Sequence, residues 1–157
     1  MKIATLLRHA RQHSWDVACL TELHGVKNLG YIAIEEFIVV LTERCALLLG
    51  PRMARRWVDQ GGHAKSGSSG RHITVAINMG NAQNGRTVHF TSAYAPPGDA
   101  TNSEERKVFF EDVEALCQEY RDKRPHFVGG DWNSHMGSKH ERKCRHGPTL
   151  AARSVRL

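Results

Sequence analysis

The sequence predicts a mixed α/β fold of the α+β kind, in which sheets are flanked by helices. Two segments carry apolar residues at helical spacing, and short apolar or β-branched runs lie between and after them. Polar residues follow several of these runs, as expected where loops carry chemistry at the ends of strands. A length of 157 residues and a hydrophobic content of 40% fit one compact domain with a real core.

The first half of the chain predicts one helix followed by strands. We expect a helix over 2–13, a strand over 16–21 that is buried on both faces and ends at Glu22, a loop through 25–30, and strands over 37–41 and 45–49. The stretch from Pro51 to Gly70 is basic and becomes rich in Gly and Ser, so it predicts an exposed loop.

The second half predicts a hairpin, a helix and a final strand. We expect strands over 71–79 and 87–94 joined at Asn84-Gly85, a break at 96–98, a helix to about residue 122 with a capping box from Thr101 to Glu104, and a short buried strand over 125–130. That last strand delivers Asp131 at its end, and periodicity is lost after Gly137.

Composition and charge exclude several classes of protein. The apolar runs are too short to span a bilayer, no signal peptide is expected after Lys2, and the four scattered cysteines suit free thiols. We therefore expect an intracellular protein, cytoplasmic or nuclear, and not a membrane, collagenous, disordered or disulfide-scaffold chain. The net charge of +6 favours polyanions.

The charge is unevenly distributed. Basic residues dominate 51–95 and the stretch from 138 to the end, whereas 96–137 holds nine carboxylates against five basic side chains. Such runs commonly form solvated faces. They also fit two basic flanks around a carboxylate-bearing centre, as in a metal-dependent enzyme that acts on a polyanion.

The segment Gly129-Gly130-Asp131-Trp132-Asn133 is the most informative motif. Paired glycines let the backbone turn closely at a strand end. If the extended geometry continues, Asp131 and Asn133 point to the same side, where a carboxylate and an amide can orient a water and bind a phosphate oxygen. The plain alternative is an Asp-x-Asn turn without a catalytic role.

Three further residues are candidate site residues. Glu22 follows a strand and can supply one oxygen ligand to Mg²⁺, or it is an ordinary surface residue in a turn. Tyr94 ends a strand and can offer its hydroxyl to a phosphate, or it covers the core edge. Arg71 opens a strand and can clamp a phosphate, or it protects a sheet edge.

These segments, in this order, resemble the endonuclease/exonuclease/phosphatase superfamily. This superfamily includes abasic-site endonucleases, pancreatic-type deoxyribonucleases and the endonuclease domains of non-LTR retrotransposons. The resemblance is carried by residues 16–22 (Asp-Val-Ala-Cys-Leu-Thr-Glu), by Tyr94-Ala95-Pro96 and by the 129–133 motif, with Arg71 and Glu104-Glu105-Arg106 in agreement between them. It covers about residues 3–137.

The resemblance implies a fold, a reaction and roles. The fold is a four-layered α/β sandwich of the deoxyribonuclease-like type, and the reaction is hydrolysis of phosphodiesters, most often in nucleic acid, with Mg²⁺ or Mn²⁺. Glu22 is similar to the metal-binding glutamate, Tyr94 to the active-site tyrosine, Asp131 to the aspartate that positions water, and Asn133 to the asparagine on the scissile phosphate. Arg71 and Asn133 are the substrate-binding residues expected. Hydrolysis needs such donors aimed at the phosphoryl oxygens.

The sequence also departs from the family pattern. The family's first strand carries a metal-binding asparagine and its last strand an Asp-His pair, whereas this sequence starts at the following helix and has no aspartate after Asp131. We therefore expect a partial domain over 1–137, a basic polar tail over 138–157, and weak or absent hydrolysis. The alternative is a catalytically dead retroelement-derived fragment that only binds polyanions.

Two other readings of the residues are less favoured. His135, His140, Cys144 and His146 have zinc-ligand chemistry but lack the two close pairs of structural zinc sites, so no zinc is expected. Residues 61–66 resemble a phosphate loop, except that Ala64 stands where a glycine precedes the lysine. We expect nucleic acid as the partner, no membrane and no obligate protein partner.

Overall fold

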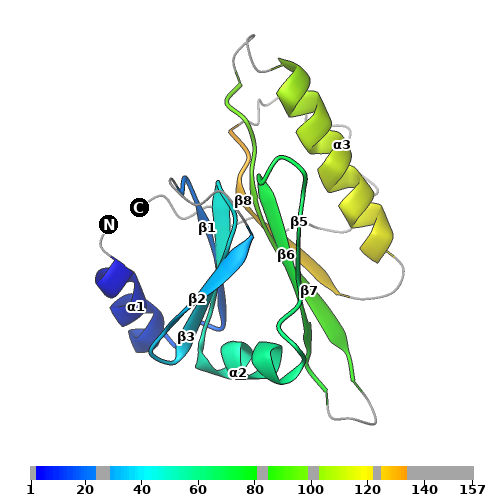
Figure 1. Ribbon diagram of the computed structural model, residues 1–157. Helices are drawn as coiled ribbons and strands as arrows, with labels where there is room; N and C mark the ends of the chain where they lie inside the picture. Colours follow the sequence, from blue (N-terminus) through cyan, green and yellow to red (C-terminus); the bar gives the residue numbers. More distant parts are fainter. Residues whose placement is uncertain (1–2, 24–28, 81–84, 99–102, 122–124, 134–157) are drawn as a thin grey trace.

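The fold is built from two four-stranded sheets and three helices. The computed structural model describes residues 3–23, 29–80, 85–98, 103–121 and 125–133. In chain order, the elements are α1 (Ile3–Gln12), β1 (Val17–Thr21), β2 (Gly30–Ile34), β3 (Phe37–Leu41), β4 (Cys45–Leu49), α2 (Pro51–Asp59), β5 (Ala64–Ser66), β6 (His72–Asn78), β7 (Thr87–Tyr94), α3 (Ser103–Tyr120) and β8 (His126–Asp131). The predicted mixed α/β class is confirmed (Figure 1).

The two sheets differ in how their strands are paired. Sheet A has the order β1-β4-β3-β2 and is antiparallel throughout. Sheet B has the order β5-β6-β7-β8, in which β7 and β8 are parallel. Parallel neighbours need a long crossover, and α3 supplies it between β7 and β8. The carboxyl ends of β7 and β8 consequently lie at the same end of sheet B.

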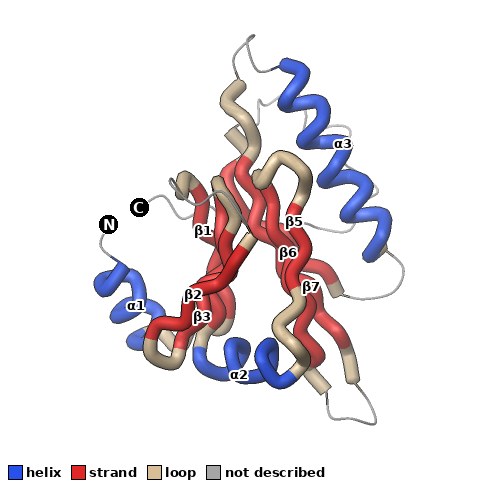
Figure 2. Tube along the Cα trace, viewed as in Figure 1, coloured by secondary structure: helices blue, strands red, loops and turns tan. Residues whose placement is uncertain are grey.

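The main core lies between the sheets. Alternate residues of β3, β4 and β6 form it, and Met53, Ala54 and Trp57 of α2 are buried in it as well. Tube and ribbon views both show α2 at one end of the space between the sheets (Figures 1 and 2). Burial of side chains from both sheets and from α2 in one cluster makes these elements a single packing unit.

Each sheet has a helix on its outer face. Leu6, Leu7 and Ala10 of α1 pack on the side of sheet A that carries Val39 and Leu48. Phe109 and Val113 of α3 pack with Ala93 and Val128 on the outer side of sheet B. The layers therefore follow the order helix, sheet, sheet, helix, as Figure 1 shows.

The predicted exposed loop over 51–70 is wrong. Residues Pro51–Asp59 form α2, and Ala64–Ser66 form β5. Proline suits the first turn of a helix, where its missing N–H costs nothing, and Met53, Ala54 and Trp57 share one buried face. The basic side chains that suggested a loop occupy the opposite face of this helix.

Strand β2 was not predicted, and two predicted strands are less buried than expected. Residues Gly30–Ile34 pair with β3, although the expected loop reached Gly30 and no element was predicted for 31–34; Tyr31, Ile32 and Ile34 favour a strand. β1 and β8 are edge strands of their sheets, so they are only partly covered and not buried on both faces. In β8, Phe127 is 59% exposed.

The remaining elements agree with the sequence. The first helix, the strands over 37–41 and 45–49, the antiparallel 72–78 and 87–94 pair and the long helix are confirmed within one to three residues. Asn84, Thr101, the four candidate zinc ligands and the tail over 138–157 lie outside the described residues, and so does part of the 1–137 domain. None of the described helices has the length and apolar character needed to cross a membrane.

Substitution of Gly130 by Ala should destabilise the fold strongly. A Cβ at this position would lie 1.8 Å from the carbonyl oxygen of Ala93, and the backbone φ of +150° disfavours side chains. We expect a loss of about 2–4 kcal/mol in unfolding free energy, measured by urea denaturation. Gly30→Ala is the matched control, since nothing lies within 4 Å of its added Cβ. Equal stability of the two variants would contradict the described packing of β8 on β7.

Candidate functional site

The two sheets approach each other closely where β1 crosses β7 and β8. The Sγ of Cys19 lies 3.6 Å from the carbonyl oxygen of Thr91, and the hydroxyl of Ser92 donates a hydrogen bond of 3.2 Å to the carbonyl of Leu20. A Cβ added to Gly129 would lie 2.9 Å from the Cys19 sulfur. Facing sheets usually pack about 10 Å apart, so small side chains are needed for such contacts.

The contacts of β1 with β7 also define the relative direction of these strands. The contact to Cys19 comes from Thr91, and the contact to Leu20 comes from the next residue, Ser92. β1 and β7 therefore run the same way. Glu22 follows Leu20 by two residues, as Tyr94 follows Ser92, so the two side chains leave the sheets at the same end.

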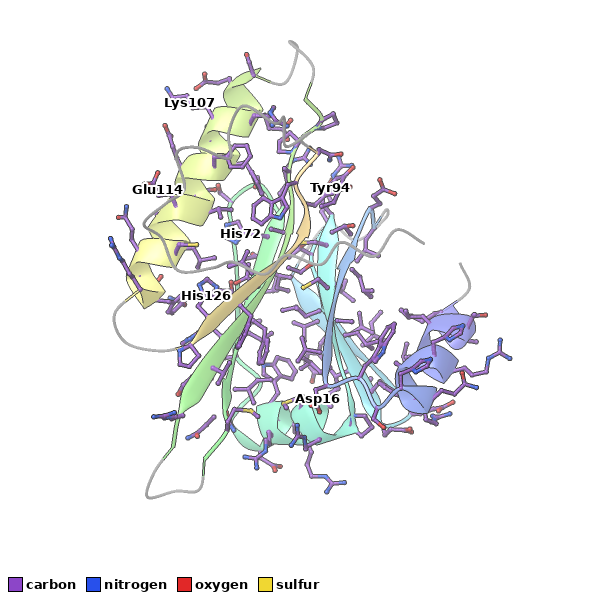
Figure 3. All side chains as sticks on the ribbon, turned by 180° about the vertical axis from the view of Figure 1, so that it is seen from behind. Asp16, His72, Tyr94, Lys107, Glu114 and His126 are labelled. Atoms are coloured by element: carbon purple, nitrogen blue, oxygen red, sulfur yellow. The ribbon has the colours of Figure 1, made fainter. Side chains whose placement is uncertain are left out.

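Tyr94 and Asp131 are cross-strand neighbours. They are register partners in the parallel β7–β8 pair. Tyr94 packs against the core between the sheets, whereas its neighbours Ala93 and Ala95 pack under α3. Since side chains alternate along a strand, Tyr94 and Asp131 both belong to the face that looks toward β1. Figure 3 shows Tyr94 on the side of sheet B away from α3.

Glu22 occupies an irregular position after β1. In the β1–β4 register Thr21 faces Cys45, so Glu22 would face Arg44, yet the N–H of Leu23 donates to the Arg44 carbonyl (3.3 Å). One extra residue is thus inserted, as in a β-bulge, and Glu22 takes a left-handed φ of 60°. Such strained positions cluster at functional sites. Glu22 is exposed to solvent.

The chain leaves the extended geometry after Asp131. The N–H of Asn133 donates to the Asp131 carboxylate (2.9 Å), and Asn133 has a left-handed φ of 43°. The extended geometry on which a common direction of the two side chains depended does not continue, and the alternative Asp-x-Asn turn is present. A local turn forms in its place, because a short carboxylate readily accepts the N–H two residues on. The Asn133 amide group donates to the Ala95 carbonyl (2.6 Å), which ties this turn to the end of β7.

Arg71 is held beneath this end of sheet B and is not extended into solvent. Its side chain is 8% exposed, its Nε donates to the Glu105 carboxylate (2.6 Å), and its guanidinium lies 5.5 Å from the ring centroid of Tyr94. Its Nη1 also lies 3.5 Å from the Tyr94 carbonyl oxygen. Arg71 therefore packs against Tyr94, and its guanidinium is already paired with Glu105.

The first turn of α3 braces the loops around the site. Arg106 donates to the Pro96 carbonyl (2.5 Å), its Nη1 lies 3.4 Å from the Asn133 carbonyl, and its guanidinium stacks over Phe110. Glu105 and Arg106 together fix Arg71 and the segments after β7 and β8. The sequence singled them out only through the resemblance, because a charged helical turn usually faces solvent.

The candidate site offers oxygen ligands for a hard cation. Carboxylates of Glu22 and Asp131 lie at the same end of their strands, and Mg²⁺ commonly takes one or two carboxylates and completes its shell with water and phosphate. Within the described ranges, no group of three or more His, Cys, Asp or Glu side chains is placed to hold a metal.

The sulfur atoms near the crossing are poorly reactive. The Cys19 residue as a whole is exposed, but its sulfur is covered by β7 and β8, and this burial raises the pKa of the thiol. Burial also raises the pKa of Cys45 to about 11, and its Sγ lies 3.5 Å from the Ser92 carbonyl oxygen. Both cysteines therefore act as small packing residues at neutral pH.

Comparison with known proteins gives no assignment: no protein-family model, no curated protein and no solved structure matches this chain.

Neutralising Glu105 should weaken the fold at the site. Glu105→Gln leaves the Arg71 guanidinium without its charged partner, and we expect a loss of about 1–2 kcal/mol in unfolding free energy. Glu104→Gln, a neighbouring exposed position in the same turn, is the matched control and should change stability by less than about 0.5 kcal/mol. A double-mutant cycle with Arg71→Met measures the coupling free energy between Arg71 and Glu105. A coupling near zero would contradict a stabilising ion pair.

Glycine should be preferred to alanine at position 22. A left-handed φ costs an L-residue about 1 kcal/mol relative to glycine, whereas glycine is ordinarily the less stable choice. Glu22→Gly should therefore exceed Glu22→Ala in unfolding free energy by about 0.5–1 kcal/mol, measured by thermal and urea unfolding. The opposite order would show that Glu22 does not hold the left-handed geometry described.

Proposed function

We propose that this chain carries the phosphate-binding site of a Mg²⁺-dependent phosphodiesterase that acts on nucleic acid, in the endonuclease/exonuclease/phosphatase superfamily. The helix–sheet–sheet–helix order supports a deoxyribonuclease-like sandwich as its fold. The net charge of +6 supports a polyanionic partner.

One observation carries this proposal. β1, β7 and β8 end on the same side, so that Glu22, Tyr94 and Asp131 gather there from three separate parts of the sequence. A carboxylate, a phenol and an Asp/Asn turn at one strand end supply the ligand and hydrogen-bonding groups that phosphodiester hydrolysis uses. Two of these positions, Glu22 and Asn133, also keep left-handed backbone that favours glycine.

The side chains suit distinct parts in the reaction. Glu22 holds the cation, which when bound neutralises charge on the phosphoryl oxygens. Asp131 is an acceptor that orients the attacking water, and its turn hydrogen bond to Asn133 fixes its direction. Tyr94 directs a hydroxyl donor toward the phosphate, supported from behind by Arg71. Asn133 binds the scissile phosphate once its amide group exchanges the Ala95 carbonyl for a phosphoryl oxygen.

A second candidate function is binding of polyanions without cleavage. It is favoured because the two side chains expected to donate to the phosphate already donate within the protein. Arg71 is paired with Glu105, and Asn133 donates to the Ala95 carbonyl. Catalysis depends on donors that are free and aimed at the transition state before reaction begins. Rearrangement of both groups on binding slows hydrolysis, which agrees with the expectation of weak activity.

A plasmid-nicking assay tests the first function. We expect slow conversion of supercoiled to nicked DNA that requires Mg²⁺ or Mn²⁺ and falls at least about a hundredfold in Asp131→Ala and in Glu22→Gln. Asp59→Asn, at the end of α2 and away from the site, is the control and should retain the rate. Nicking that persists in Asp131→Ala would identify a contaminating nuclease and contradict the proposal.

Fluorescence anisotropy with a short DNA duplex separates the second function from the first. Binding that weakens steeply with salt, without nicking, supports the binding-only function, because counterion release governs such affinity. Absence of both nicking and salt-dependent binding excludes both functions.

A further inference from the structure

Three histidines line the face of sheet B that α3 covers. His72, His89 and His126 belong to the neighbouring strands β6, β7 and β8, and His89 and His126 are register partners. His72 and His89 are 6% and 3% exposed, and His126 is partly buried. Figure 3 shows His72 and His126 on the side of the sheet that faces α3.

The C-terminal end of α3 packs directly on two of these rings. Tyr120 stacks on His89, with ring centroids 3.9 Å apart, and meets His126 edge to face at 5.0 Å. His126 Nε2 lies 2.8 Å from the Thr91 hydroxyl, which is itself 2.6 Å from the hydroxyl of Thr74. The Tyr120 ring at the C-terminal end of α3 therefore covers the imidazole rings of His89 and His126.

Charged groups face the cluster from two elements. Asp112 of α3 interacts electrostatically with His72, and Lys65 of β5 pairs with Glu119 of α3 (3.0 Å), which interacts with His89. On sheet B, Arg71 pairs with Glu105 at the far end of the helix. His126 is affected mainly by burial and by the neighbouring His89, and Tyr120 covers it.

Burial favours the neutral form of the His126 and His72 imidazoles. Desolvation, with a smaller contribution from the neighbouring His89, lowers the pKa of His126 to about 4. Burial also lowers the pKa of His72, because it outweighs the opposing attraction of Asp112. A histidine whose pKa is depressed on folding stabilises the docked state fully only above its unfolded pKa, near 6.5. That stabilisation declines as the pH falls from about 6.5 toward 4.

We propose that docking of α3 on sheet B is a proton-sensitive clamp, in which protonation of His126, assisted by His72, releases the C-terminal half of α3. The same helix carries Glu105 and Arg106, which brace Arg71, Pro96 and the turn after Asp131. Release of the helix therefore loosens the candidate phosphate site in mildly acidic solution. This consequence for the site rests on the proposed function, whereas the release of the helix does not.

Hydrogen exchange measured by mass spectrometry on the full chain, without substrate, tests the clamp. Between pH 7.5 and 5.0, after correction for intrinsic exchange, we expect the opening constant of amides in 109–120 to rise at least about fivefold. About 30-fold is the ceiling set by a pKa moving from near 6.5 to about 4, and solvent screening of the partly exposed ring reduces it. Amides of β4, in the core between the sheets, should show no such change.

The variant His126→Gln should remove most of this pH dependence, since a glutamine can still bond to Thr91 but does not titrate. His72→Gln should reduce the pH dependence less, because Asp112 partly offsets the burial of His72. His9→Gln, an exposed position on α1, is the control and should behave as the parent chain.

Three results would overturn the clamp. These are unchanged exchange in α3, an equal increase in β4, and full pH dependence in a folded His126→Gln variant. If that variant does not fold, the parent chain still decides by whether the increase is confined to α3 and begins below about pH 6.5. The exchange measurement needs no catalysis. If α3 shows the pH-dependent release but the chain never nicks DNA, only the proposed function is contradicted and the clamp stands.

Discussion

The close contact between β1 and the β7–β8 pair is the constraint on which the candidate site depends. It joins β1, an edge strand of sheet A, to β8, an edge strand of sheet B, and to its neighbour β7. The contact requires Gly129 beside the Cys19 sulfur and the short side chain of Ser92. A larger residue at position 129 separates the sheets at the point where their strands end. Glu22 then moves away from Tyr94 and Asp131, and the candidate site is no longer assembled.

Helix α3 links this contact to the rest of sheet B. Its first turn binds Arg71 and the loops after β7 and β8, and its last turn rests on His89 and His126. One helix therefore contacts the candidate site at its first turn and the titratable His126 at its last turn. Coupling between the two ends is part of the proposed clamp, because the same helix contacts both regions. Stability of the sheet and the geometry of the site are thus maintained by the same packing.

Much of the fold follows from local patterns, and the errors have physical causes. Fully apolar runs such as 37–41 identify central strands because both faces of these strands are covered. The helix over 51–59 was missed because its stripe of three buried residues is short and its basic residues dominated the composition. Only the family resemblance predicted that Glu22, Tyr94 and Asp131 share a site. Their spacing in the sequence could not, since the three strand ends meet through tertiary packing. The ion pair between Arg71 and Glu105, and the turn at Asn133, needed coordinates.

The central claim is that the ends of β1, β7 and β8 share one cation-binding environment, and paramagnetic relaxation by Mn²⁺ tests it most directly. In two-dimensional NMR spectra of the full chain, substoichiometric Mn²⁺ should broaden the amide signals of Leu23, Ala95 and Asn133 together. Glu22→Gln should abolish that broadening, because the hard cation loses its carboxylate ligand. Broadening confined to other regions, or the same broadening in the Glu22→Gln variant, would contradict the claim.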